Sequence, residues 1–426
     1  SIYIRRALDD HLLNRSTYLK LSEAKATTHI AKVADLIKKF VRKHRDVLGK
    51  EQAKFLRRSL ETTDPFPHFY ITAKIHKVPW KTRPIVSCSG SVSHGLGRWV
   101  DCILQPICKQ LPTYLESSLV LVDILKELPP LPPGARLFTA DAVSMYTNID
   151  TNHALSAMKN FLRSSPLAQH APVEPLLEGL ALIMRHNVFR FDDTFWLQLD
   201  GTAMGTPPAC MYATLYYAIH ENRTLIRKYK RFLLLYKRYI DDVLGIWNTA
   251  LDPDGSFFAA FGRDMDRFGK LRWEVSDLVT QVDFLDVTLR ITPSGTVDSR
   301  LFEKQLNLYL YLPANSCHPP GVLKGIIYGS IFRIRRLTTD LDVCHRNIQD
   351  LYRRLLKRGY PPSTLRPIFA EGLARDHSRK PAALPEADIP ATPHPFFLHV
   401  PYHPQDPPSP EIQRLFRATC ISPAAD

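Results

Sequence analysis

The clearest pattern along the chain is a pair of short apolar runs on either side of a segment with two adjacent acidic residues. The runs cover residues 232–236 and 243–247, and Tyr239-Ile240-Asp241-Asp242 lies between them. Two hydrophobic runs separated by turn-tolerant residues predict a β-hairpin. The tip of that hairpin would hold the carboxylates of Asp241 and Asp242 side by side.

Two further stretches predict strands. Between residues 187 and 201, aromatic and aliphatic residues alternate around Asp192-Asp193, which predicts a second hairpin. Residues 137–140 are mostly apolar and predict a short buried strand that ends at Asp141. A carboxylate at the end of a strand can converge with one at a hairpin tip if the two strands are neighbours in one sheet.

Other parts of the chain have apolar residues at helical spacing. A helix is predicted to begin at Asp150, Thr151 or Asn152, each of which can cap it, and another is predicted over 209–221, after a Pro-Pro pair. Residues 1–64 predict helices, since Ile30, Val33, Ile37, Phe40 and Val41 recur at helical spacing. The cations of this segment lie largely off that apolar face, and they form either a solvated face or an RNA-binding one. Strands and helices together predict an α+β fold.

Composition limits the function classes. The chain has 426 residues, of which 45% are hydrophobic, and a formal charge of +14. This charge favours a polyanionic partner, either nucleic acid or an anionic membrane surface. No apolar run reaches the roughly 18 residues of a transmembrane helix. The cysteines are scattered without zinc-ligand spacing, which favours a reduced intracellular protein. The chain begins without Met, as a piece of a longer product would.

The acidic residues indicate the chemistry. Adjacent carboxylates repel one another, and a divalent cation commonly neutralises them. If Asp141 and the hairpin tip converge, they can hold two Mg²⁺ ions, which activate a 3′-hydroxyl and stabilise a leaving pyrophosphate. Such phosphoryl transfer needs positioning and charge neutralisation more than a special nucleophile.

Two motifs resemble those of reverse transcriptases. Residues 141–146, Asp-Ala-Val-Ser-Met-Tyr, are similar to the first palm motif, and residues 239–242 are similar to the catalytic hairpin. The resemblance implies that Asp141, Asp241 and Asp242 are catalytic and bind two Mg²⁺ ions, with Mn²⁺ as a substitute, helped by the backbone carbonyl of Ala142. It also implies that Tyr146 lies beneath the sugar of the incoming nucleotide and excludes a 2′-hydroxyl.

Further blocks are similar to those of Penelope-like retroelements, which are related to telomerase. In the family's order, they are the fingers signature (69–77 and 83–87), residues 198–207, a primer block (284–287) and thumb segments between 311 and 336. The resemblance covers roughly residues 65–340. It implies a right-hand polymerase fold with fingers, a palm containing an antiparallel sheet, and a thumb.

The expected organisation follows from these blocks. The expected parts are a helical basic N-terminal leader (1–64), fingers (65–136), a palm (137–300) with part of the fingers inserted at about 155–200, a basic helical thumb (301–375), and a Pro-rich linker with a short C-terminal connector (376–426).

The remaining site residues come from the same blocks. Binding of a triphosphate requires cationic side chains, and arginine forms bidentate hydrogen bonds with phosphate. The expected nucleotide-binding residues are Lys74, Arg83, Tyr146, Met204 and Gly205. The expected nucleic-acid contacts are Lys77, Lys81, Tyr239, Phe284, Leu285, Arg333, Arg335 and Arg336.

The leading hypothesis is an RNA-directed DNA polymerase of a Penelope-like retroelement. Its expected partners are an RNA template, a DNA primer or RNA–DNA hybrid, and dNTPs. No membrane partner is expected, and the protein is expected to act in the nucleus. The alternatives are a telomerase-like reverse transcriptase and a non-catalytic, retroelement-derived nucleic-acid-binding protein. Tyr146 disfavours an RNA-dependent RNA polymerase. Residues 325–328 superficially resemble the start of a GIY-YIG endonuclease, but the rest of that motif is missing, so no nuclease is expected in this chain.

Overall fold

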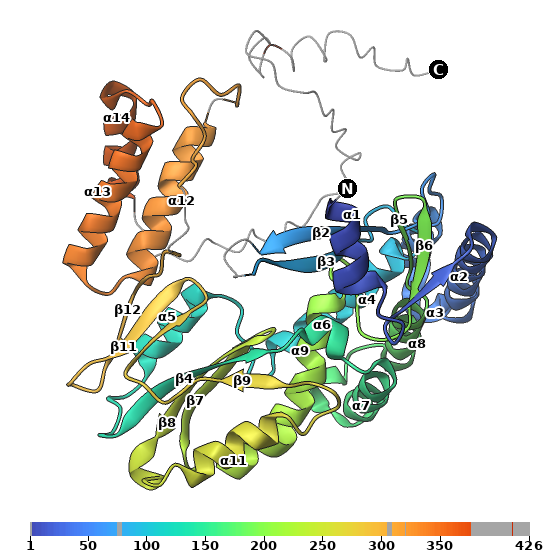
Figure 1. Ribbon diagram of the computed structural model, residues 1–426, viewed down its shortest axis with the longest axis horizontal. Helices are drawn as coiled ribbons and strands as arrows, with labels where there is room; N and C mark the ends of the chain where they lie inside the picture. The colour runs from blue at the N-terminus through green and yellow to red at the C-terminus, as the bar shows by residue number, and fades with distance from the viewer. Residues whose placement is uncertain (1, 75–78, 305–308, 320, 376–410, 412–426) are drawn as a thin grey trace, which may run out of the picture. The chain divides into compact units, whose positions relative to one another are not determined.

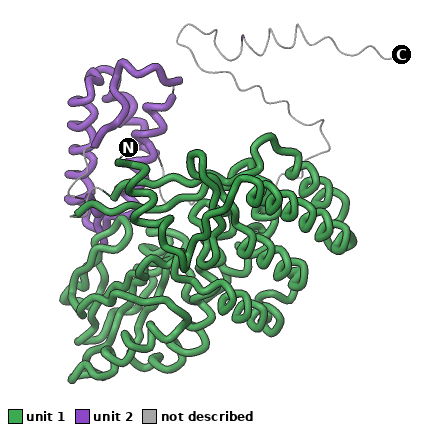
Figure 2. The backbone as a smooth tube through the Cα atoms, turned by 45° about the vertical axis from the view of Figure 1, so that its right-hand side comes forward, with its two compact units in different colours: residues 1–297 green, residues 298–426 purple. Residues whose placement is uncertain are grey.

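The computed structural model describes residues 2–74, 79–304, 309–319, 321–375 and 411. The chain divides into two compact units, residues 1–297 and 298–426 (Figure 2). The first unit mixes helices and strands, and three helices dominate the described part of the second (Figure 1). The architecture is therefore mixed α/β.

A four-stranded antiparallel sheet carries the acidic residues singled out by the sequence. Its strand order is β7-β8-β4-β9. The strands are β7 (Leu233–Tyr239), β8 (Asp242–Asn248), β4 (Ala135–Ala142) and β9 (Trp273–Val275). The predicted hairpin is confirmed as β7–β8, and the predicted buried strand before Asp141 is confirmed as β4.

Helices bury the central sheet. They are α9 (Ala209–His220) and α11 (Ser256–Met265), which lie beside the sheet in Figure 1. Helix α7 (Thr151–Ser164) packs against α9. The carboxylate of Asp150 caps α7 by accepting a hydrogen bond from the backbone N–H of His153 at 2.9 Å. Gly245 on β8 lies opposite Phe138 on β4, and a Cβ at this glycine would lie 2.2 Å from the phenyl ring. The sheet therefore needs a residue without a side chain at this position.

A second sheet corrects one expectation. Its order is β1-β6-β5-β2-β3. The strands are β1 (Tyr18–Leu21), β6 (Thr194–Gln198), β5 (Val188–Phe191), β2 (His68–Lys74) and β3 (Lys81–Ser87). The β5–β6 hairpin confirms the prediction around Asp192-Asp193. The leader, which was expected to be helical, contains helices but also the short strand β1. Strand β1 takes its hydrogen bonds from β6, a distant partner that local periodicity cannot reveal.

The helices next to this sheet include those predicted near the N-terminus. They are α1 (Ile2–Ala7), η1 (Leu8–Leu12), α2 (Glu23–Lys43), α3 (Arg45–Arg58), α4 (His94–Lys109) and α8 (Val173–Arg185). The apolar face of α2 is buried as its spacing predicted, with Ile37 and Phe40 each 1% exposed.

Shorter elements complete the first unit. They are α5 (Ser118–Glu127), α6 (Met145–Asn148), η2 (Pro166–Ala168), η3 (Glu221–Leu225), α10 (Ile226–Tyr229), η4 (Thr249–Leu251), β10 (Gln281–Phe284) and β11 (Val287–Ile291). Strands β10 and β11 form an antiparallel hairpin.

The second unit contains most of β12 (Val297–Leu301), followed by α12 (Val322–Leu337), α13 (Leu341–Lys357) and α14 (Pro362–Ala374). The three helices share an apolar core that includes Ile331, Leu351 and Leu365. The carboxylate of Asp340 caps α13 through the backbone N–H groups of residues 342 and 343. Within the described ranges, no helix has both the length and the apolar character needed to cross a bilayer.

Candidate active site

Three carboxylates occupy matching positions on neighbouring strands. Asp141 on β4 lies directly opposite Asp242 on β8 and also opposite Glu274 on β9. Directly opposed residues of antiparallel strands project to the same face of a sheet. Asp241 occupies the turn before β8, and its carbonyl accepts a hydrogen bond from the backbone N–H of Ala142 at 3.0 Å. The sheet thus brings together the three aspartates that the sequence singled out, and Glu274, which it did not.

Two cavities meet these carboxylates. The first, of roughly 350 Å³, is lined by Asp141, Asp242 and Glu274, together with Phe284 and Leu285. The second, of roughly 410 Å³, is lined by Asp141, Asp241 and Glu274, together with residues of the β2–β3 hairpin and the leader. Asp141 borders both cavities and therefore lies where the two meet.

The donor chemistry fits a divalent cation. Carboxylate and carbonyl oxygens are the ligands that Mg²⁺ prefers, and Asp141, Asp241, Asp242 and Glu274 supply them at one sheet edge. As the side chains lie, the described residues contain no cluster of three His, Cys, Asp or Glu groups close enough to hold one ion. The residues therefore fit a divalent cation in the chemistry of their oxygen ligands and in their positions along the strands.

The hairpin tip is held by a buried ion pair. Ile240, the second residue of the Tyr-Ile-Asp-Asp segment, has a left-handed backbone with φ of 55°, which is unfavourable for a β-branched residue. Its carbonyl accepts a hydrogen bond from the Arg238 guanidinium at 2.7 Å. The same guanidinium donates to both oxygens of Glu221, at 2.6 and 2.9 Å, and to the carbonyl of Thr214 at 2.8 Å.

Both members of this pair are shielded from solvent. The side chains of Arg238 and Glu221 are 1% and 0% exposed, and the hydroxyls of Thr113 and Tyr236 also donate to the Glu221 carboxylate. Burial lowers the pKa of Arg238, but the charge of Glu221 and the hydrogen bonds to it outweigh burial and hold that pKa above its ordinary value. The guanidinium therefore stays charged and fixes the turn that precedes Asp241.

The ion pair of Arg238 and Glu221, called the clamp from here on, was not predicted from the sequence, although a signal for it was present. Alternation along β7 predicts that residue 238 faces inward together with Tyr236, and an arginine on a buried face needs a partner. Glu221 directly follows the strongly apolar helix α9 and supplies the opposite charge.

Cations line the larger cavity together with the carboxylates. Lys74 on β2 pairs in register with Lys81 on β3, and Arg83 follows two residues later on the same face of β3. All three residues line the cavity. Lys77 was expected to contribute here, but it lies outside the described residues. A cavity lined by both cations and carboxylates suits a metal-bound triphosphate.

Tyr146 lies in the same cavity, at the start of the short helix α6. It is 9% exposed, and its hydroxyl lies 3.3 Å from the Cys210 sulfur. Burial raises the pKa of Tyr146 well above its ordinary value, so the phenol stays neutral. Met204 also lines the cavity. Gly205 approaches the backbone of β3 instead: a Cβ there would lie 2.4 Å from the Val86 carbonyl oxygen.

The other expected contacts fall into two groups. Tyr239 ends β7 opposite Asp242, and Phe284 and Leu285 line the smaller cavity with Asp141. Arg333, Arg335 and Arg336 lie on α12, in the second unit. Of these, Arg335 is exposed and donates to the carbonyl of Leu373 at 3.0 Å.

The leader contributes cavity residues that the sequence did not reveal. Asp10, His11, Asn14, Thr17 and Tyr18 line the larger cavity. The hydroxyl of Thr82 donates to Asp10 at 2.7 Å and lies 2.8 Å from the His11 Nε2 atom. The leader is thereby attached to β3 next to Arg83. This juxtaposition depends on long-range strand pairing, so no local signal could have predicted it.

Comparisons with known proteins give a partial family match and several structural likenesses. A model of the animal helix-turn-helix domain matches residues 310–369. No curated protein matches the chain. Among solved structures, the telomerase of Candida albicans, in complex with a fragment of telomeric RNA, is similar over 74% of this chain and 57% of that one, with 11% identity and a TM-score of 0.49.

Two further structures are similar. The apo telomerase of Candida tropicalis matches over 73% of this chain and 59% of its own, with 9% identity and a TM-score of 0.44. The sicinivirus RNA-dependent RNA polymerase matches over 76% of this chain and 71% of its own, with 11% identity and a TM-score of 0.46. The chain thus spans less than three fifths of the length of these telomerase chains.

Proposed function

We propose that the chain is an RNA-directed DNA polymerase of the Penelope-like type, which extends a DNA primer on an RNA template with dNTPs in the nucleus. The observation that carries the proposal is the register of Asp141 with Asp242 and Glu274, with Asp241 in the adjoining turn. The resemblance of residues 141–146 and 239–242 to reverse-transcriptase motifs supports it, as does the basic net charge of +14.

Each part of the site has a role in this proposal. Asp141, Asp241 and Asp242 would hold two Mg²⁺ ions, which when bound supply charge neutralisation at the transferring phosphoryl group. Lys74, Lys81 and Arg83 line the same cavity as Asp141 and Asp241 and would hold the triphosphate.

Selection of the sugar is the role proposed for Tyr146. Its ring is fixed by burial and by its contact with Cys210, and it lines the cavity beside Asp141 and Met204. A rigid ring beneath the sugar would clash with a 2′-hydroxyl, because a packed side chain cannot move aside without loss of contacts. Incorporation of ribonucleotides into the primer strand would therefore be slow.

Primer extension on a primed RNA template tests the proposal. The reaction contains Mg²⁺ and either dNTPs or NTPs, and the test variant carries Asp241→Asn and Asp242→Asn. We expect extension with dNTPs and a fall in rate on the order of 10³-fold or more in the variant, since lost charge stabilisation amounts to several kcal/mol. Asp35→Asn removes an exposed carboxylate on α2 and serves as the matched control, with activity unchanged.

The possible outcomes separate the alternatives. Extension with NTPs as readily as with dNTPs would contradict the role of Tyr146 and favour an RNA polymerase. Tight binding of the primed template without extension, in Mg²⁺ or Mn²⁺, would contradict the catalytic proposal and favour a non-catalytic nucleic-acid-binding protein.

A further inference from the structure

We infer that Lys270 is a positioning residue for Tyr146 and thereby helps to set the preference for deoxynucleotides, without touching the nucleotide itself. The inference rests on the proposed polymerase function. Its basis is a chain of contacts from Lys270, through two carboxylates and a glycine loop, to the backbone of Tyr146.

The glycine loop packs directly on the backbone around Tyr146. The backbone N–H of Thr202 donates to the Tyr146 carbonyl at 2.7 Å, and the N–H of Gly201 donates to the Ile149 carbonyl at 3.1 Å. Gly201 has φ of 78°, and a Cβ there would lie 2.8 Å from the Tyr146 carbonyl oxygen. The loop leaves no space at this point, so a shift of residues 200–202 would also displace Tyr146.

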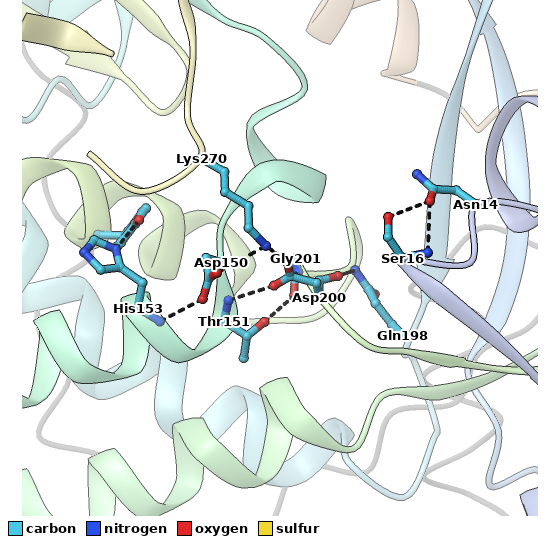
Figure 3. Close-up of polar contacts among 10 residues, drawn as sticks. Asn14, Ser16, Asp150, Thr151, His153, Gln198, Asp200, Gly201 and Lys270 are labelled. Carbon is cyan, nitrogen blue, oxygen red and sulfur yellow. Dashed lines mark hydrogen bonds and ion pairs between the residues drawn. The ribbon is translucent and has the colours of Figure 1, made fainter. Parts of the chain in front are cut away.

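Lys270 contacts this loop through the carboxylate of Asp200 (Figure 3). Its ammonium group lies 2.5 Å from an oxygen of Asp200 and 3.2 Å from an oxygen of Asp150. The other oxygen of Asp200 accepts hydrogen bonds from the backbone N–H groups of Thr151 and Gly201, at 2.9 and 3.0 Å. Asp200 therefore ties the start of α7 to the loop, and Lys270 fixes Asp200.

Charge explains why the lysine matters. Asp150 and Asp200 both approach one ammonium group, and two carboxylates that share a site repel each other without a cation between them. The hydrogen bonds to Asp200 and Asp150 raise the pKa of Lys270, so it remains charged at neutral pH. Loss of the charge would push Asp200 away from Asp150 and move the attached loop.

Removal of the Lys270 side chain should change the free energy of unfolding only slightly. The Lys270 side chain is 58% exposed, and exposed ion pairs contribute little to the free energy of unfolding. Lys270 also lies only three residues before Trp273, which pairs with Ala142 next to Asp141. Its removal should therefore change the alignment of Tyr146 with the carboxylates more than it changes folding.

Single-nucleotide incorporation tests the inference. kcat and KM are measured for one dNTP and the matching NTP with the wild-type chain and the variants Lys270→Met, Lys270→Arg, Tyr146→Ala and Asp150→Asn/Asp200→Asn. The asparagines keep an acceptor at each position, including the cap of α7, but remove both charges. Arg163→Met is the matched control, because Arg163 forms an exposed ion pair with Glu174 at the far end of α7.

We expect Lys270→Met to lower the ratio of kcat/KM for dNTP over NTP by about two- to fivefold, which is what a modest change in geometry supplies. The double asparagine variant should keep the ratio near the wild-type value, because neutral amides at positions 150 and 200 do not repel each other. Lys270→Arg should restore the ratio, and Arg163→Met should leave it unchanged. An equal loss for both nucleotides in Lys270→Met, with the ratio intact, would overturn the inference. Absence of discrimination in the wild type, unaffected by Tyr146→Ala, would instead overturn the proposed sugar selection.

Discussion

A guanidinium and an ammonium group carry the same charge but bind a phosphate differently, because only the guanidinium presents two parallel donors. Arg83 and Lys81 lie two residues apart on one face of β3, and both line the larger cavity. If that cavity holds a triphosphate, the planar guanidinium of Arg83 should bind it more tightly than a group with the same charge but without two parallel donors. The two cations are therefore not interchangeable.

Arg83→Lys should raise the KM for dNTP about tenfold, since it removes one charge-assisted hydrogen bond while keeping the charge. The kcat should change little if the contact is made equally in the bound substrate and the transition state. Steady-state incorporation kinetics measure both constants. Arg190→Lys, in β5 of the same sheet, is the matched control. A fall in kcat at unchanged KM would contradict a role in substrate binding.

At the scale of elements, the β7–β8 hairpin depends on the ion pair between Arg238 and Glu221, whose second member lies outside the hairpin. Arg238 joins three elements, because its guanidinium contacts Glu221 of η3, the Thr214 carbonyl of α9 and the Ile240 carbonyl of the turn. Its own backbone N–H donates to the carbonyl of Thr113 at 2.8 Å. The unfavourable backbone of Ile240 is thus maintained by surrounding contacts.

Arg238→Met should destabilise the chain by about 3–5 kcal/mol, because it leaves the Glu221 carboxylate buried and unpaired. Arg238→Met combined with Glu221→Met should recover most of that loss, because both charges are then removed. Urea unfolding measures the free energies. The double variant should still extend a primer about ten- to a hundredfold more slowly, because the Ile240 carbonyl has lost its donor. Recovery of both stability and activity would show that the clamp is structural only.

The same elements explain what the sequence could predict. The β7–β8 hairpin, strand β4, the cap at Asp150 and the apolar face of α2 follow from local periodicity and turn chemistry, and each is confirmed. The pairing of β1 with β6 and the position of Glu274 depend on partners far along the chain, and the partner of Arg238 lies in a different element. Hydrophobic patterning records which face of an element is buried, not which element covers it.

At the scale of the whole molecule, the excess of positive charge is distributed over both units. In the second unit, Arg346, Arg353 and Lys357 are exposed on α13, and their spacing of seven and four residues aligns them along one side of the helix. In the first unit, Lys25, Lys32 and Lys39 are similarly exposed along α2. The two helices therefore offer matched basic stripes.

If α13 contacts a primer–template duplex, the affinity for the duplex should fall steeply as the salt concentration rises. Replacing the three cations of α13 with glutamine should reduce the slope of log K against log salt by about two to three, because each phosphate contact contributes about 0.9 to that slope. Fluorescence anisotropy with an RNA–DNA hybrid between low and moderate salt measures the slope. The matched triple variant of Lys25, Lys32 and Lys39 removes the same charge. An equal change of slope in both variants would mean that net charge, rather than contact by α13, attracts the duplex, because long-range attraction depends on total charge whereas counterion release depends on direct contact.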